Sequence, residues 1–188
     1  MDSRFDRFEK LNETTLSEQT IYDGKVIKCL LRDVELADGR KSKREIVQHN
    51  GGCCILPIDS EGNAYVVHQF RSPFGEVLTE IPAGKLELGE DPYECAVREL
   101  EEETGFKSGK IIPLGKMISS PGYCSEVIYM YLALDLEFIG WHLDEGEFVN
   151  VSKIPFEELL RMVNNDEICD GKSCLCILKA AGRLKDGV

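Results

Sequence analysis

The feature that most constrains this chain is a helix whose two ends are both marked within residues 89–106. Asp91 can cap the N-terminus of a helix, Pro92 suits the first helical position, and Glu94 stands where it can complete a capping box. Gly105 suits the left-handed residue that commonly ends a helix. We therefore predict a helix that begins directly after Asp91 and ends directly before Gly105.

The predicted helix carries an acidic stripe. At about 100° per residue, Glu103 lies about 40° to one side of Glu99, and Glu102 lies about 60° to the other side. A separate apolar face is formed by Tyr93, Val97 and Leu100. Like charges four residues apart cost about 0.2–0.5 kcal/mol on an isolated helix, and the single guanidinium of Arg98 cannot neutralise three carboxylates. A divalent cation can, and carboxylate oxygens suit Mg²⁺ or Mn²⁺, so we predict a metal site on this stripe.

Composition indicates an acidic globular protein. Its 188 residues suffice for one domain with a real core. With 22 Lys and Arg against 34 Asp and Glu, the net charge of 22 − 34 = −12 argues against general binding to nucleic acid or to anionic membranes. No apolar signal region opens the chain, and no stretch reaches the roughly 18 apolar residues of a spanning helix. The eight cysteines contain no CxxC pair and are expected to be reduced, which predicts a cytoplasmic protein.

Turn residues and apolar runs predict the remaining elements. Asp-Gly pairs at residues 23–24 and 38–39 predict an antiparallel meander within residues 1–49, and residues 50–188 are expected to form the main domain. Four strands are predicted there, at residues 53–58, 64–70, 111–115 and 127–134, the first two buried on both faces. Two amphipathic helices are predicted at residues 156–164 and 173–185. This order of elements favours an α/β or α+β sandwich.

Residues 84–106 resemble the Nudix box over its whole length of 23 residues. Its seven fixed identities are all present: Gly84, Glu90, Arg98, Glu99, Glu102, Glu103 and Gly105. Such a match arises by chance with a probability on the order of 10⁻⁸ per starting position. The resemblance implies an α+β protein with the α/β/α sandwich of the Nudix fold, a mixed sheet and an N-terminal antiparallel extension. It also implies hydrolysis of a nucleoside diphosphate linked to another moiety.

The same resemblance implies roles for individual residues. Four ligands to Mg²⁺, or to Mn²⁺ in its place, are implied: the carboxylates of Glu99, Glu102 and Glu103 and the backbone carbonyl of Ala83. Gly84 is expected to give the tight turn, and Glu90 and Arg98 to brace it. Arg98 and Glu102 are also counted with the catalytic residues. In this chemistry a metal offsets charge on the bridging phosphates and lowers the pKa of a bound water.

Stretches outside the box resemble the ADP-ribose pyrophosphatase subfamily of Nudix enzymes. Pro121 lies sixteen residues after Gly105, and the other stretches are KREIVQH (43–49), HQFR (68–71), EIPAGKLE (80–87) and LDEGEF (143–148). Four substrate contacts are implied: Arg44, Glu45, Arg71 and Glu126. Arginine suits phosphate because its planar guanidinium donates two parallel hydrogen bonds. Without the resemblance, Arg71 is equally well explained as an ordinary surface residue at a strand end.

Two glutamates in residues 143–148 are implied for the rest of the chemistry. Glu145 matches the catalytic glutamate that serves as general base, and Glu147 matches an additional metal ligand. The two assignments can be exchanged. Gly146 stands between them, where relatives often carry a polar residue, and this is a departure from the subfamily pattern.

The expected reaction is hydrolysis of ADP-ribose to AMP and ribose 5-phosphate. Two alternatives stay open: cleavage of another nucleotide sugar, such as GDP-mannose or ADP-glucose, and binding of ADP-ribose without cleavage, which the intact box disfavours. Subfamily members pair through an N-terminal layer, so residues 1–49 are expected to form a homodimer interface. The expected partner is otherwise a small nucleoside diphosphate, with no nucleic acid and no membrane.

Overall fold

The computed structural model describes residues 11–140, 149–185 and 187. Within them the chain divides into two compact units. Unit 1 holds the chain up to His49 together with Ser120–Glu126, and unit 2 holds Asn50–Ser119 together with the chain from Val127 onward. The segment Ser120–Glu126 is thus joined to residues that precede it by some 70 positions, which the sequence does not indicate.

Unit 1 is built on a three-stranded antiparallel sheet in the order β1-β2-β3. Its strands are β1 (Thr14–Asp23), β2 (Lys28–Glu35) and β3 (Lys41–Gln48). Turns follow β1 and β2 at the two Asp-Gly pairs, as predicted, and Gly39 has a φ of 83° that favours glycine. Val47 N–H donates to the carbonyl of Tyr123 at 2.7 Å, which holds the later segment against β3.

Unit 2 contains two sheets. One has the order β7-β4-β9-β8, formed by β7 (Ala83–Lys85), β4 (Gly52–Pro57), β9 (Val127–Phe138) and β8 (Phe106–Ile118). The pairing of β4 with β9 is parallel and the other pairings are antiparallel, so this sheet is mixed as expected. The other sheet has the order β10-β5-β6, formed by β10 (Asn150–Pro155), β5 (Asn63–Arg71) and β6 (Glu76–Glu80).

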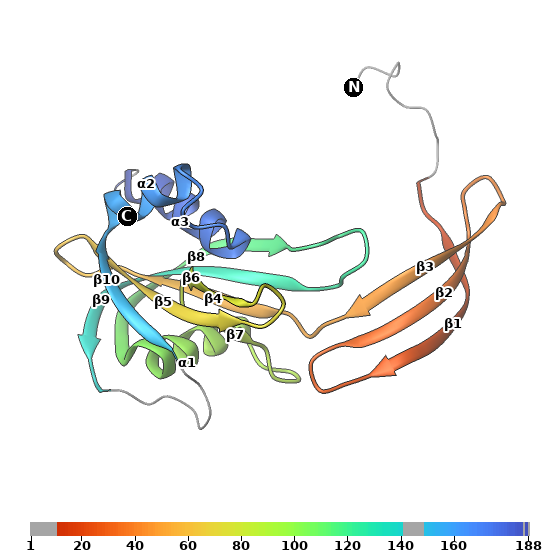
Figure 1. Cartoon of the computed structure of the whole chain (residues 1–188), viewed down its shortest axis with the longest axis horizontal. Coiled ribbons are helices and arrows are strands. Elements are labelled where there is room, and N and C mark those ends of the chain that lie inside the picture. Colours follow the sequence, from red (N-terminus) through yellow and green to blue (C-terminus); the bar gives the residue numbers. More distant parts are fainter. Residues whose placement is uncertain (1–10, 141–148, 186, 188) are drawn as a thin grey trace, which may run out of the picture. The chain divides into compact units, whose positions relative to one another are not determined.

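Three helices cover the strands of unit 2, in the α+β arrangement that was predicted (Figure 1). Helix α1 (Pro92–Thr104) lies on one side of the strands, and α2 (Phe156–Asn164) and α3 (Gly171–Lys185) lie on the other. Both ends of α1 are where the sequence places them. Asp91 accepts a hydrogen bond from Tyr93 N–H at 2.8 Å, and Gly105 has the left-handed φ of 71°. The second bond of a capping box, from the backbone N–H of Asp91 to the side chain of Glu94, is absent from the hydrogen bonds of the described residues.

Strand β4 separates two hydrophobic cores, because its successive side chains face opposite layers. Cys54 and Leu56 belong to the core beneath α2 and α3. Cys53 and Ile55 belong to the core beneath α1, where they pack with Leu100. All six residues of β4 are buried, as the apolar run predicted. The central strand therefore fixes the helix that carries the acidic stripe on one layer and the C-terminal helices on the other.

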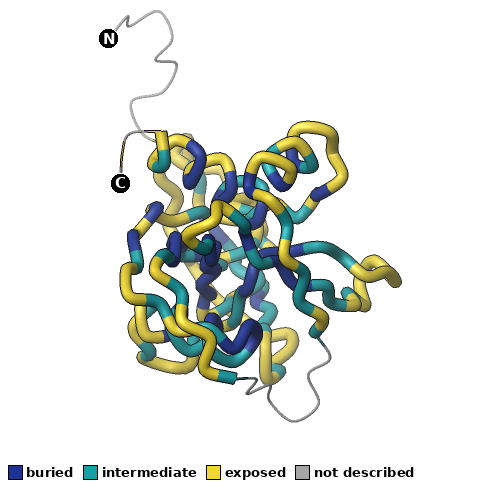
Figure 2. Tube along the Cα trace, turned by 90° about the vertical axis from the view of Figure 1, so that its left-hand side faces the viewer, coloured by how far each residue is buried: buried dark blue, intermediate teal, exposed yellow. Residues whose placement is uncertain are grey.

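Some expectations about strands were wrong. Strand β5 is buried on both faces only at its centre, where the neighbouring residues Val66 and Val67 are 0% and 2% exposed; near its end Phe70 is 58% exposed. Figure 2 shows buried, intermediate and exposed stretches following one another along the trace. Strands β6, β7 and β10 were not predicted: β7 has only three residues, and neither β6 nor β10 forms a continuous apolar run. The predicted strand at 111–115 is the middle of the longer β8.

Across the described ranges, none of the helices combines the length and the apolar character needed to cross a membrane.

Candidate active site

The acidic stripe of α1 is buried on the side that faces β7. Glu99 and Glu103 are only 7% and 4% exposed. Their helix is held in place by Cys95, Ala96 and Leu100, which are fully buried. The apolar face predicted from the sequence was wrong in part, because Tyr93 is 48% exposed. Carboxylates are seldom buried to this degree without partners, because removing their charge from water is costly. The partners of these two side chains therefore define the site.

The backbone of Ala83 and Gly84 meets both buried carboxylates. Ala83 N–H donates to Glu103 Oε2 at 2.9 Å. A Cβ atom at Gly84 would lie 1.6 Å from Glu99 Oε1, so only glycine lets the Glu99 carboxylate keep this position against the strand. Gly84 is the middle residue of strand β7 rather than part of a tight turn, and what it provides is a close approach between a strand and a carboxylate.

Arg98 supplies positive charge at the edge of this cluster. Its Nη1 donates to Glu99 Oε1 at 2.7 Å and to Glu102 Oε2 at 2.9 Å. Its Nε donates to Glu90 Oε1 at 3.0 Å, which is the bracing contact expected from the sequence. Burial alone would lower the pKa of Arg98, but its hydrogen bond with Glu90, the charge of Glu99 and its hydrogen bond with Glu102 raise that pKa above its ordinary value.

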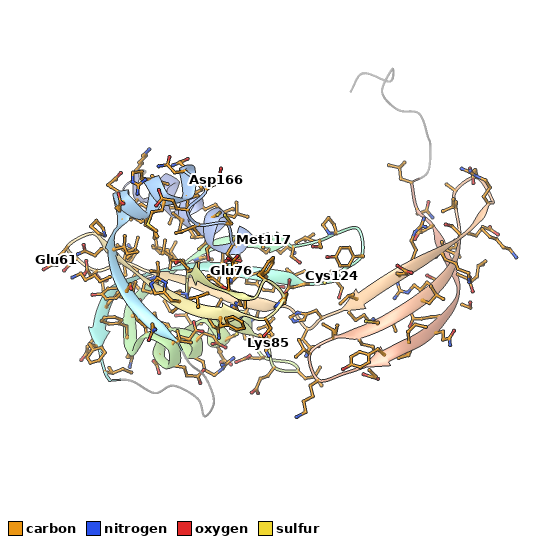
Figure 3. All side chains as sticks on the ribbon, in the orientation of Figure 1. Glu61, Glu76, Lys85, Met117, Cys124 and Asp166 are labelled. Carbon is orange, nitrogen blue, oxygen red and sulfur yellow. The ribbon has the colours of Figure 1, made fainter. Side chains whose placement is uncertain are left out.

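The loop before α1 is tied to the same guanidinium. Glu90 Oε2 accepts from Glu87 N–H at 2.8 Å, which closes the turn, and the hydrogen bond from Arg98 holds the pKa of Glu90 below its usual value. The backbone carbonyl of Lys85, a residue labelled in Figure 3, accepts from Arg98 Nη2 at 3.4 Å. Strand β7, the loop and α1 are thus joined through one side chain.

The donor set fits a hard divalent cation. No group of three His, Cys, Asp or Glu side chains in the described part of the chain is already arranged as a metal site. However, oxygens of Glu99 and Glu102 both lie within 2.9 Å of Arg98 Nη1, so these two carboxylates already converge on one cationic point. Glu103 adds a third carboxylate beside Ala83. Such oxygens are the ligands that Mg²⁺ and Mn²⁺ prefer.

The other residues predicted for the site belong to other elements of the two units. Arg71, at the end of β5, donates to both oxygens of the buried Glu80 at 2.6 Å. Arg44 and Glu45 lie on β3 of unit 1, where Arg44 pairs with Glu13 at 2.7 Å. Glu126 also lies in unit 1, 3.5 Å from His49. Glu145 and Glu147 lie outside the described residues.

One buried group beside the site was missed. Glu80 is 2% exposed, and it pairs with Lys172 as well as with Arg71. Burial would raise the pKa of Glu80, but hydrogen bonds and charges from these two cations lower it. Glu80 opens the stretch EIPAGKLE noted above, which was its only signal in the sequence, whereas nothing near Lys172 indicated a role.

The comparisons with known proteins agree with this geometry. The model of the NUDIX domain matches residues 48–170, which include β7, α1 and the loop between them. The chain belongs to the NUDIX family. Among its relatives, this NUDIX protein is 42% identical to the ADP-ribose pyrophosphatase of Bacillus subtilis (strain 168), over 90% of this chain and 92% of that protein.

Two further matches cover nearly the whole NUDIX protein. The methanol dehydrogenase activator of Bacillus methanolicus is 40% identical, over 88% of this chain and 90% of that one. A crystal structure of an ADP compounds hydrolase superposes with a TM-score of 0.83, covering 95% of this chain and 98% of that chain. Its sequence identity is 19%, so it shows that the fold is shared.

The contact at Gly84 gives a specific prediction. In Gly84→Ala the new Cβ would overlap the Glu99 carboxylate, which is the flexible end of its side chain and must rotate away. We expect affinity for Mn²⁺ to fall by about 10-fold or more, the scale seen when groups that orient metal ligands are removed. The thermal unfolding midpoint should change little. Titration with Mn²⁺ followed by electron paramagnetic resonance measures the first quantity, and circular dichroism measures the second.

Gly182→Ala on α3 is the matched control, because a Cβ there meets no atom within 4 Å. Equal Mn²⁺ affinity in the two alanine variants would contradict the assignment of Glu99 to the metal site.

Proposed function

We propose that this chain hydrolyses the pyrophosphate bond of ADP-ribose, with a divalent metal, to give AMP and ribose 5-phosphate. The observation that carries the proposal is the meeting of Glu99 and Glu103 with the backbone of Ala83 and Gly84. The choice of substrate is supported by 42% identity to a relative named as an ADP-ribose pyrophosphatase. One water is consumed: its oxygen joins one phosphorus, and the bridging oxygen leaves on the other phosphate.

The residues that would hold Mg²⁺, or Mn²⁺ in its place, are Glu99, Glu102, Glu103 and, through its carbonyl, Ala83. When bound, the metal supplies positive charge that offsets the bridging phosphates and makes the attacking water more acidic. The chain itself prepares the carboxylates. Arg98 draws Glu99 and Glu102 together through one nitrogen, and Ala83 N–H orients Glu103, so little side-chain freedom remains to be lost on binding.

A base must take the proton of the attacking water. We assign this role to Glu145, with Glu147 as an additional metal ligand, on the resemblance of residues 143–148 to the subfamily. A carboxylate suits the role because it can accept the proton directly or through one intervening water.

The substrate contacts proposed are Arg44, Glu45, Arg71 and Glu126. Arg71 is oriented for this by Glu80, which binds two of its nitrogens at 2.6 Å and fixes the plane of the guanidinium. Arg44 is held in unit 1 by Glu13.

We further propose a homodimer formed through residues 1–49. Strand β1 is exposed along its whole length, and unit 1 exposes several large apolar side chains, namely Leu16, Ile21, Tyr22 and Val26. Sedimentation equilibrium should give twice the mass of one chain.

A cytoplasmic location is supported by eight cysteines that are all free thiols. Small nucleoside diphosphates are then the expected partners, with no nucleic acid and no membrane.

A substrate panel tests the reaction. With Mg²⁺ or Mn²⁺ present, we expect ADP-ribose to be converted to AMP and ribose 5-phosphate, with kcat/KM higher than for GDP-mannose or ADP-glucose. The ratio of kcat/KM values is the right measure because it reports differential binding of the transition state. Preference for GDP-mannose would keep the chemistry and change the substrate. Binding of ADP-ribose without turnover at any metal concentration would instead indicate a sensing domain.

Glu145→Gln tests the base. We expect the rate to fall by about 10² to 10⁴, the usual contribution of general base catalysis, while Mn²⁺ affinity stays near that of the wild type. Glu147→Gln is the matched variant and should weaken Mn²⁺ binding. If the two variants show the opposite pattern, the roles of the two glutamates are exchanged.

A further inference from the structure

The chain changes sheets directly before the proposed metal-binding carbonyl. Strand β6 pairs with β5 in one sheet and ends at Glu80, whereas β7 begins at Ala83 and pairs with β4 in the other sheet. Ile81 and Pro82 therefore belong to neither ladder. Ile81 is fully buried, so its backbone N–H must find a partner outside the sheets.

Three different elements supply the partners of this crossing. Ser173 Oγ on α3 accepts from Ile81 N–H at 2.9 Å. Ile55 N–H on β4 donates to the carbonyl of Pro82 at 2.9 Å. Glu103 on α1 accepts from Ala83 N–H at the same distance. The contacts from β4 and α1 come from elements already described around the site. The contact from Ser173 connects the crossing to the C-terminal helix α3.

The hydroxyl of Ser173 is itself oriented. Ser173 is fully buried, and its hydroxyl donates to Asp170 Oδ2 at 2.5 Å. Asp170 directly precedes α3 and also accepts from Ser173 N–H at 3.1 Å, as a capping residue does. Because the single hydrogen of the hydroxyl is directed to Asp170, an oxygen lone pair is directed to Ile81.

The same turn of α3 holds the preceding residue. Lys172 donates to Glu80 and, at 2.8 Å, to Asp170. Arg71 holds Glu80 from β5. The first turn of α3 thus fixes both the side chain of Glu80 and the backbone N–H of Ile81.

We propose that Ser173 is a positioning residue for the metal-binding backbone at Ala83. Its hydrogen bond fixes the peptide before Ile81, and Pro82 transmits that orientation because its ring restricts φ. The inference rests on the function proposed above for the Ala83 carbonyl. Ser173 touches neither metal nor substrate, so its effect must appear first in the affinity for metal.

Ser173→Ala removes the acceptor of the Ile81 N–H. We expect Mn²⁺ affinity, measured by electron paramagnetic resonance without substrate, to fall by about 10-fold or more, as for other groups that orient metal ligands. The Mg²⁺ concentration that gives half the maximal rate should rise by a similar factor. Ser173→Cys keeps a small side chain with a weak acceptor and should give a smaller shift, and it decides the question if the alanine variant does not fold.

Ala180→Gly is the matched control. It introduces glycine at a buried position of the same helix, which lowers stability but removes none of the hydrogen bonds described for residues 81–83. We expect this variant to lose stability in urea and to bind Mn²⁺ as the wild type does.

The outcomes separate the two proposals. If wild-type protein cleaves ADP-ribose but both Ser173 variants bind Mn²⁺ as tightly as Ala180→Gly, the positioning role is overturned and the function stands. If the Ser173 variants bind Mn²⁺ more weakly but the wild type does not cleave ADP-ribose, the positioning role stands and the substrate is wrong. Wild-type protein that binds no Mn²⁺ would overturn both.

Discussion

The burial of Glu99 and Glu103 is the constraint on which the rest of the site depends. Two carboxylates one helical turn apart repel each other, and neither has water enough to be solvated. The two carboxylates are accommodated by the cation of Arg98, the backbone N–H of Ala83 and the space that Gly84 leaves by having no side chain. Each of these contacts requires a fixed distance between α1 and β7, and that distance is set by the core that α1 shares with β4.

Much of this arrangement follows from local sequence. The ends of α1 are specified by Asp91 and Gly105, because capping acts between residues a few positions apart. The acidic stripe follows from helical periodicity, and the bracing of Glu90 by Arg98 lies within the same 23-residue segment. The apolar run that becomes β4 could also be recognised from the sequence, because a strand buried on both faces does not alternate between apolar and polar residues.

Contacts between distant segments could not be predicted from such local patterns. Ser173 and Ile81 are 92 positions apart, and no local feature of either residue predicts their hydrogen bond. Arg71 was predicted from the sequence as a substrate contact, but its pairing with Glu80 depends on the register of β5 with β6. Strands β7 and β10 were missed for a similar reason, because short or polar strands are defined by their partners rather than by their own composition.

Because β4 is buried on both faces, the shapes of its side chains, rather than their polarity, determine its register. Apolar side chains occupy both faces, so sliding by one residue would exchange the layers without exposing any polar group. Cys54 stands opposite Ala83, and Cys53 opposite Gly84. A slipped strand would therefore present a different β7 residue to Glu99. The close packing of side chains beneath the two helix layers thus also determines which backbone atoms lie beside the buried carboxylates.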